Sequence, residues 1–324
     1  MSISLKSSKH LMINNNQVCL TGASGFIGSQ LSPFLNKNSI PCYHWDRSDP
    51  LNFNQSSILV HLAGRAHRMK DSSEDPSTAF RKVNRDLTIS LATQAIKQKL
   101  KKFVFISSVK VIGENPGNYD LKSACFPKEP YGISKWEAEQ ELENLFSNQT
   151  DTQCIILRLP MVYGEKNKGN MLPLLKAASK KICLPLSAAK GKRSMIYVGN
   201  ILSAILNIAQ DKKHNRKSFQ TYFLNDGSDL TSAELYSLIY QSMHEKSGLF
   251  YFPERLFRLS GNIGSGLEHV LKRKLPISKN VVSRLFDEYR FKSKKFNNDY
   301  NWQPPFTPNQ GIKNTVNWYL DSRG

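Results

Sequence analysis

Short apolar stretches recur along the first half of the chain, and segments with helical spacing separate them. The stretches read "QVCL" at 17–20, "CYHWD" at 42–46, "SILVHLAG" at 57–64, "KFVFISS" at 102–108 and "CIILRLP" at 154–160. Continuous apolar runs of this length predict strands that are buried on both faces. Because such strands alternate with helices, the pattern predicts an α/β fold with a doubly wound parallel sheet and helices on both faces.

Apolar residues at helical spacing predict the helices between these strands. One helix is expected from about Phe26, a second after Asp75-Pro76 and a third from Ser134 to about Phe146. The regularity fades beyond residue 165. Further helices are expected around 170–180, around 200–209, around 231–243 and after Thr307-Pro308.

The charge of the chain is its one unusual bulk property. Of 324 residues, 40% are hydrophobic and 22% are charged, as in ordinary globular proteins, but the formal net charge is +19. A positive field favours anionic partners such as nucleotide phosphates, nucleic acid or an acidic membrane face, and a solvated basic surface is the simplest explanation. The basic stretch "KKHNRK" at 212–217 has no alternating aromatic residues. Nucleic acid is therefore not the partner we expect.

Cysteine and histidine positions argue against a metal site. The five cysteines are scattered without a CxxC pair, which suits reduced thiols in a cytosol. His61 and His67 lack a further ligand nearby, and His61 is expected to pack beside a cofactor at a strand end. Residues 1–17 have no apolar signal region, and no run reaches 18 apolar residues. We expect a soluble, cytoplasmic protein without a metal or a membrane span.

The junction of the first strand and first helix has the pattern of a dinucleotide-binding turn. "TGASGFIG" places Gly22, Gly25 and Gly28 where a tight turn, close approach to a pyrophosphate and helix packing need glycine. Asp46 follows Gly28 by 18 residues, where a carboxylate can bind the ribose hydroxyls of NAD. The adjacent Arg47 could bind a 2′-phosphate instead. NAD is therefore the predicted cofactor, and NADP is not excluded.

Tyr131 and Lys135, in "YGISK", are one helical turn apart and can share a face. A free tyrosine has a pKa of about 10, which a neighbouring ammonium and the positive nicotinamide ring together would lower toward neutral pH. Ser108 ends a predicted strand, where its hydroxyl could hydrogen-bond a reacting oxygen. The three residues together predict an acid–base centre for carbonyl–hydroxyl redox chemistry.

These motifs resemble the extended short-chain dehydrogenases/reductases, in particular the NAD-dependent nucleotide-sugar epimerases and reductases. The resemblance covers nearly the whole chain and includes "TGASGFIG", "VHLAGRAH", "FISSVKVIGE", "PYGISKWEAE", "LRLPMVYG" and "KRSMIYVGN". It implies a Rossmann-type sheet with a smaller C-terminal α/β substrate lobe. The expected divisions are an N-terminal tail at 1–17, a dinucleotide-binding domain at 18–165 and a partly interleaved substrate lobe at 166–324.

The resemblance also implies roles for individual residues. Ser108, Tyr131 and Lys135 match the family's catalytic set, and Lys135 can also hold the nicotinamide ribose. The residues expected to contact the cofactor are Gly22, Gly25, Phe26, Ile27, Gly28, Asp46, Arg47, Leu62, Ala63, Gly64 and Lys135. Those expected to contact a UDP-sugar are Ser108, Lys110, Tyr131, Asn170 and Arg193. Lys110 could equally be solvated, and Asn84 is expected to be structural.

A departure from the family pattern limits which of the family's reactions we expect this chain to catalyse. The 4,6-dehydratases carry Asp and Glu after the catalytic strand, where this chain has Val109 and Lys110. Hydride exchange at C4 without elimination is therefore expected, most simply by a 4-epimerase of a UDP-hexose or UDP-N-acetylhexosamine in surface-polysaccharide precursor synthesis. A reductase of UDP-4-keto-6-deoxy-hexosamines needs the same residues and stays open, as does a non-enzymatic dinucleotide sensor. The resemblance also implies a homodimer through helices around 80–98 and 132–146.

Overall fold

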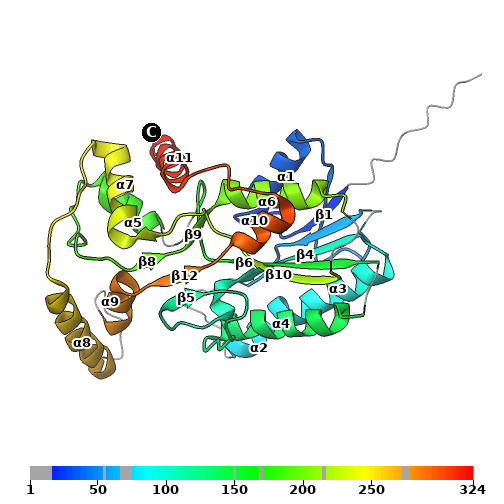
Figure 1. Cartoon of the computed structure of the whole chain (residues 1–324), viewed down its shortest axis with the longest axis horizontal. Coiled ribbons are helices and arrows are strands. Elements are labelled where there is room, and N and C mark those ends of the chain that lie inside the picture. The colour runs from blue at the N-terminus through cyan, green and yellow to red at the C-terminus, as the bar shows by residue number, and fades with distance from the viewer. Residues whose placement is uncertain are drawn as a thin grey trace, which may run out of the picture.

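A six-stranded parallel sheet forms the centre of the computed structural model (Figure 1). The strands lie in the order β10 (Phe219–Phe223), β6 (Gln153–Leu159), β4 (Lys102–Ser108), β3 (Ile58–His61), β1 (Val18–Thr21) and β2 (Cys42–Trp45). The structure describes residues 17–53, 56–65, 75–148, 151–167, 169, 171–213, 217–271 and 278–323. The doubly wound parallel α/β sheet predicted from the sequence is confirmed.

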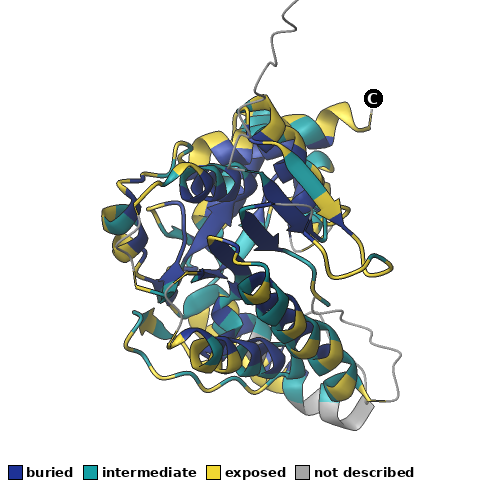
Figure 2. Cartoon of the chain, turned by 90° about the vertical axis from the view of Figure 1, so that its right-hand side faces the viewer, coloured by how far each residue is buried: buried dark blue, intermediate teal, exposed yellow. Residues whose placement is uncertain are grey.

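Helices cover both faces of this sheet. On one face lie α1 (Gly28–Lys37) and α6 (Val198–Gln210), and on the other lie α3 (Leu87–Lys97) and α4 (Pro130–Phe146). Successive strand residues point to opposite faces, so that Val18 and Leu20 pack in one core while Cys19 packs in the other. The inner strands β1, β3, β4 and β6 are accordingly the most buried part of the fold, whereas the edge strands β2 and β10 are partly exposed (Figure 2).

A smaller lobe lies beyond the carboxyl ends of the large sheet (Figure 1). Its four-stranded sheet has the order β11 (Leu230–Thr231), β8 (Lys192–Arg193), β12 (Tyr289–Phe291) and β5 (Gly117–Tyr119). A second, two-stranded sheet pairs β7 (Met161–Tyr163) with β9 (Met195–Tyr197). The lobe contains β5 from before residue 165, and the large sheet contains β10 from after it.

The remaining helices lie mostly in the second half of the chain. They are α5 (Met171–Ser179), α7 (Ser232–His244), α8 (Glu254–Leu271), α9 (Lys279–Phe286), α10 (Lys294–Tyr300) and α11 (Pro308–Asp321). Capping boxes at Thr231 and Thr307 begin α7 and α11. The sequence pattern did not predict α8, α9 and α10. No helix among the described residues is long and apolar enough to cross a membrane.

The helix predicted after Asp75 is not continuous. Asp75 caps α2 (Pro76–Arg81) by accepting hydrogen bonds from the amides of Ser77 and Thr78. A π-helical turn, η1 (Lys82–Asp86), then separates α2 from α3. Such turns are frequent at functional sites, because they alter which side chains a helix presents. The turn places Asn84, a buried residue, toward the candidate active site described below.

Candidate active site

The candidate cofactor crevice lies where the strand order reverses between β1 and β3. In open parallel sheets, ligands bind beyond the carboxyl ends of the strands at this point. Gly22 follows β1 with a φ of +70°, and a Cβ there would lie 2.6 Å from the amide nitrogen of Ala63. A Cβ on Gly28 would clash with the carbonyl oxygen of Gly22. Both positions therefore require glycine, and the turn leaves its backbone open to a ligand.

The other predicted cofactor residues border this crevice. Gly25 donates its amide to the Gly22 carbonyl at 3.0 Å and closes the turn. Phe26 and Ile27 are half-buried and pack against the core, and the amides of α1 begin directly after them. No side chain caps α1 at Ile27. The amides of Ser29, Gln30 and Leu31 already donate to the Gly25 and Ile27 carbonyls, so an anion would be bound by the amides before Ser29.

Asp46 and Arg47 follow β2 and are exposed. β2 pairs with β1 so that Trp45 lies opposite Thr21, which places Asp46 level with the glycine turn. The Asp46 carboxylate accepts hydrogen bonds from the Ser48 amide at 3.3 Å and the Ser48 hydroxyl at 3.2 Å. A glycine turn at the start of a helix, followed by a carboxylate at the end of the next strand, fits a dinucleotide with ribose hydroxyls.

The loop after β3 joins the cofactor crevice to the predicted catalytic residues. The Ala63 amide donates to Thr21 Oγ1 at 3.2 Å, and the Leu62 amide donates to the Thr21 carbonyl at 3.3 Å. A Cβ on Gly64 would lie 3.4 Å from Lys135 Nζ and 3.2 Å from Asn84 Oδ1. At Gly64, the loop after β3 therefore passes close to Lys135 of α4 and to Asn84.

Ser108 and Tyr131 meet at the carboxyl edge of the sheet. Ser108 is the last residue of β4, and Tyr131 lies in the first turn of α4. Burial raises the pKa of Tyr131, and a hydrogen bond with Ser108 lowers it in part. In the protein without cofactor, burial outweighs the hydrogen bond with Ser108, so the pKa of Tyr131 stays raised, and the lowering expected from Lys135 and the nicotinamide ring together stays a prediction. The phenol therefore holds its proton until a further positive charge is present.

Lys135 lies buried one turn after Tyr131. Its Nζ donates to the Ile106 carbonyl at 2.9 Å and lies 4.4 Å from the centre of the Phe105 ring. Burial lowers its pKa to about 7, and the nearby Glu139 carboxylate acts in the opposite direction. Lys135 can therefore gain or lose a proton near neutral pH.

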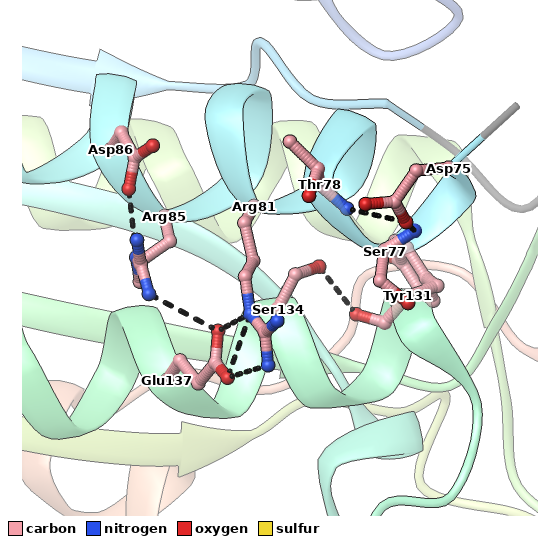
Figure 3. Close-up of polar contacts among 9 residues, drawn as sticks. All are labelled: Asp75, Ser77, Thr78, Arg81, Arg85, Asp86, Tyr131, Ser134 and Glu137. Atoms are coloured by element: carbon pink, nitrogen blue, oxygen red, sulfur yellow. Dashed lines mark hydrogen bonds and ion pairs between the residues drawn. The ribbon is translucent and has the colours of Figure 1, made fainter. Parts of the chain in front are cut away.

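Asn84 fixes the arrangement of the loop and α4. Its Oδ1 accepts from the Arg65 amide at 2.8 Å, and its Nδ2 donates to the Arg65 carbonyl at 3.2 Å and to Ser134 Oγ at 3.1 Å. Ser134 Oγ in turn donates to the Tyr131 carbonyl at 2.9 Å (Figure 3). This is the structural role that we expected for Asn84.

Ion pairs hold α2 and η1 against α4 (Figure 3). Arg81 donates to both carboxylate oxygens of Glu137, with the shortest contact at 2.6 Å, and Arg85 lies 3.7 Å from the same carboxylate. These contacts are partly exposed, so each contributes little to the stability of the fold. Their main consequence is orientation, because the helix bearing Asn84 is held parallel to the helix bearing Tyr131.

His61 is a buried hydrogen-bonding residue. Thr88 donates its hydroxyl hydrogen to the Asn84 carbonyl at 2.8 Å, so it accepts from His61 Nε2 at 2.9 Å. Nδ1 is then left to accept from the Thr21 hydroxyl at 2.7 Å. Burial holds the pKa of His61 well below its ordinary value, so the ring is neutral. His67 lies outside the described residues, among which no cluster of potential metal ligands occurs.

A buried ionic network lies next to Lys135 and was not predicted from the sequence. Glu139 accepts from Ser107 Oγ at 2.5 Å and pairs with Arg158 at 2.6 Å, and all three residues are buried. Two local signals could have indicated it. Arg158 interrupts the apolar run "CIILRLP", and Glu139 lies four residues after Lys135 on the buried face of α4.

Val109 and Lys110 occupy different environments. Val109 begins a short 3₁₀ turn, η2 (Val109–Val111), and is buried in an apolar cluster with Ile112 and Phe291. Lys110 Nζ lies 3.2 Å from the Glu114 carboxylate and 3.9 Å from the Glu129 carboxylate. Lys110 is therefore ion-paired at the rim of the site, and it supplies neither of the carboxyl groups that elimination would need.

Of the two residues of the lobe that were predicted to contact the substrate, Arg193 and Asn170, only Arg193 is among the described residues. Arg193 lies in β8 with its guanidinium 5.1 Å from the centre of the Tyr289 ring, and its Nη1 donates to the Arg284 carbonyl at 3.4 Å. Burial lowers the pKa of Arg193, although the group stays charged near neutrality. Asn170 lies outside the described residues. The contact of either residue with a sugar nucleotide stays a prediction.

Replacing Lys135 by Met should stabilise the protein without cofactor at neutral pH. The folded pKa of about 7 is below the unfolded value of about 10.4, so the unfolded chain binds more protons between these values. The cost of burying this lysine is therefore full below pH 7 and fades as the pH rises toward 10. We expect Lys135→Met to raise the unfolding free energy by about 2–4 kcal/mol at pH 7, after the lost hydrogen bond to Ile106 is subtracted.

Urea unfolding of the cofactor-free protein at pH 7 and near pH 10 measures this effect. Lys128→Met is the matched control, because Lys128 is exposed. It should change the unfolding free energy by less than about 0.5 kcal/mol at either pH. An equal stability of Lys135→Met and the original protein at pH 7 would contradict the pKa assigned to Lys135.

Two known proteins match nearly the whole length of this chain. A UDP-glucose 4-epimerase of Vibrio cholerae is 28% identical over 94% of this chain and 96% of its own length. An N-acetyl-α-D-glucosaminyl-diphospho-ditrans,octacis-undecaprenol 4-epimerase of Escherichia coli O157:H7 is 28% identical over 94% of this chain and 95% of its own length.

The fold of this chain matches that of a solved structure, and its sequence matches the model of a protein family. The UDP-glucuronic acid 4-epimerase of Bacillus cereus, in complex with UDP-glucuronic acid and NAD, superposes with a TM-score of 0.71 at 17% identity, over 94% of this chain and 99% of its own. The model of the NAD dependent epimerase/dehydratase family matches residues 18–220, which include the glycine turn and the Ser108–Tyr131–Lys135 set. The chain is therefore a member of the NAD dependent epimerase/dehydratase family.

Proposed function

We propose that this protein is an NAD-dependent 4-epimerase of a nucleotide-diphosphate sugar, with a UDP-hexose or UDP-N-acetylhexosamine as substrate. The observation that carries the proposal is the meeting of Ser108, Tyr131 and Lys135 at the sheet edge beside the Gly22 turn. The apolar, buried Val109 next to this set supports exchange of hydride without elimination. The names of the Vibrio cholerae and Bacillus cereus proteins support C4 as the reacting carbon.

Each residue of the set has a distinct task in this reaction. Ser108 Oγ hydrogen-bonds the sugar oxygen, and the Tyr131 phenol exchanges a proton with that oxygen. Lys135, with a pKa of about 7, lies one helical turn away and can pass a proton to or from Tyr131. NAD, when bound in the glycine crevice, supplies hydride uptake and return. The burial of Lys135 limits the access of water to this set, which would protect a transient keto-sugar from side reactions.

A second candidate substrate is a sugar carried on a polyprenyl diphosphate. The Escherichia coli relative, whose name gives such a substrate, matches nearly the whole chain at the same identity as the UDP-glucose 4-epimerase. Both substrate types present a diphosphate next to the sugar. Arg193 could bind that diphosphate in either case, because a guanidinium forms bidentate hydrogen bonds to phosphate oxygens. A homodimer through α3 and α4 stays a prediction from the family resemblance.

The decisive experiment incubates the purified protein with UDP-glucose and, separately, with UDP-N-acetylglucosamine, without added cofactor. We expect NAD to copurify and the C4 epimer to form in at least one reaction, which chromatography of the nucleotide sugars would detect. Stoichiometric oxidation of NADH or NADPH by a UDP-4-keto-6-deoxy-hexosamine, with no epimer from either sugar, would establish the reductase instead. Absence of both reactions and of bound NAD would contradict the redox proposal.

A further inference from the structure

Exposed apolar side chains gather on one short segment of the lobe. Among the described residues, nine large hydrophobic side chains are exposed, and five of these lie within residues 250–263. They are Phe250, Tyr251, Leu256, Leu259 and Ile263, with exposed fractions between 48% and 71%. Single exposed apolar residues are ordinary, but a group of this kind marks an interaction surface. We refer to these five residues as the α8 apolar patch.

Helix α8 has two apolar sides, of which only one is packed within the protein. On the packed side, the Phe257 ring lies 5.5 Å from the Phe286 ring, and a Cβ on Gly261 would lie 2.7 Å from Val282. On the other side, Leu256, Leu259 and Ile263 follow one another at intervals of three and four residues and form a single exposed stripe. A surface helix of a self-contained domain carries polar residues in such a stripe.

The α8 apolar patch lies far from the large sheet but is coupled to the lobe. Figure 1 shows α8 at the outer end of the lobe, beyond α9. Residues near the end of α9 contact β8, because the Arg284 carbonyl accepts from Arg193 and Gly191 packs against Phe286. A partner bound to the patch would therefore sit on the lobe side of the protein, where Arg193 lies, and leave the cofactor crevice free.

Exposed cations lie on and near α8. The described residues among 254–288 contain four Lys or Arg and four Asp or Glu, and two of these acids pair with Arg258. Arg255, Lys279 and Arg284 are exposed, while Arg258 pairs with Glu254 at 2.7 Å and Asp287 at 3.2 Å. In a chain with a net charge of +19, an exposed apolar stripe with exposed cationic neighbours has the composition of a helix that lies on an anionic lipid surface.

We propose that the α8 apolar patch docks on the anionic surface of a lipid bilayer. In the docked state α8 lies in the plane of the headgroups, its exposed stripe enters the boundary with the acyl chains, and Arg255 contacts anionic headgroups. This binding is peripheral, in agreement with the absence of a spanning helix among the described residues. In this proposal, some of the basic residues behind the net charge of +19 contact anionic lipid headgroups. The proposal does not depend on which sugar is the substrate.

Cosedimentation of the full chain with vesicles tests the proposal. The vesicles contain either phosphatidylcholine alone or phosphatidylcholine with roughly 30% phosphatidylglycerol, an anionic lipid. We expect the protein to bind the anionic vesicles at low salt and to release them as screening increases. The triple variant Leu256→Ser/Leu259→Ser/Ile263→Ser should bind about tenfold more weakly or worse, and Arg255→Glu should show a smaller loss, about fivefold.

Two controls separate docking from unfolding. Leu320→Ser removes an equally exposed leucine in the last turn of α11 and should leave vesicle binding unchanged. The triple variant should keep the unfolding midpoint and NAD content of the original protein, since the altered side chains contact solvent. Failure of the original protein to bind anionic vesicles, or undiminished binding by the triple variant, would overturn the proposal. Conversion of a dimer to a monomer by the triple variant, without vesicle binding by either, would assign the patch to self-association instead.

Discussion

Tyr131→Phe should lower the kcat for 4-epimerisation of the nucleotide sugar by about 10²–10⁴-fold, which is the contribution of a positioned acid–base group. The substitution removes one oxygen and keeps the ring, whose edge contact with Phe80 has a centroid distance of 6.1 Å. Because burial already favours the protonated phenol, the oxygen contributes little to folding as a charged group. The loss should therefore appear in kcat, with bound NAD and the unfolding midpoint unchanged.

Chromatographic assay of epimer formation measures the effect over the required range. Tyr251→Phe is the matched control, because this tyrosine is 71% exposed in the lobe and should retain full activity. Ser108→Ala should also lower kcat, by a smaller factor of about 10–100, since it removes only a hydrogen bond to the reacting oxygen. If Tyr131→Phe retained full activity, another group would have to move the proton.

Breaking the Glu139–Arg158 pair should produce the largest loss of stability. Both side chains are buried, and Glu139 holds two Arg158 nitrogens and the Ser107 hydroxyl. Removing one partner leaves the other charge buried without compensation, which costs about 3–5 kcal/mol. We therefore expect Glu139→Leu to lower the unfolding free energy by this amount, measured by urea unfolding at pH 7.

The double variant distinguishes ionic pairing from simple packing. Glu139→Leu/Arg158→Leu removes both charges and should recover more than half of the loss, because apolar side chains of similar volume often replace a buried ion pair at little cost. The exposed pair of Arg258 and Glu254 gives the comparison, since Glu254→Leu should change stability by less than about 1 kcal/mol. Additive losses in the double variant would show that the two side chains stabilise the fold independently.

The strands and the glycine turn could be predicted because their signals are local. A continuous apolar run identifies a strand that is covered on both faces, and all five predicted strands occur in the sheet. Gly22 and Gly28 must be glycine for reasons that their own neighbours set, namely a positive φ and a close backbone contact. Tyr131 and Lys135 share a helix face through their spacing alone. These features need only the periodicity of helices and strands.

The lobe could not be predicted to the same depth, because its helices do not depend on local pattern. Helix α8 contains three glycines, which lower its helix propensity, and it exposes apolar side chains that a helix packed on a core would bury. Its existence depends on packing against α9 through Phe257 and Gly261. The π turn at Asn84 is likewise fixed by contacts with Arg65 and Ser134 rather than by its own residues.

The sequence by itself determined the sheet, the cofactor turn and the chemical identity of the acid–base set, since each follows from residues that are close in the chain. Only the tertiary structure decided the protonation of that set. In the protein without cofactor, burial raises the pKa of Tyr131 and lowers that of Lys135 to about 7, which the spacing of the two residues does not indicate. The tertiary structure also brings Lys110 into an ion pair with Glu114, and Arg158 into one with Glu139. The physical reason is that desolvation and ion pairing depend on which distant segments fold together, and no local pattern records this.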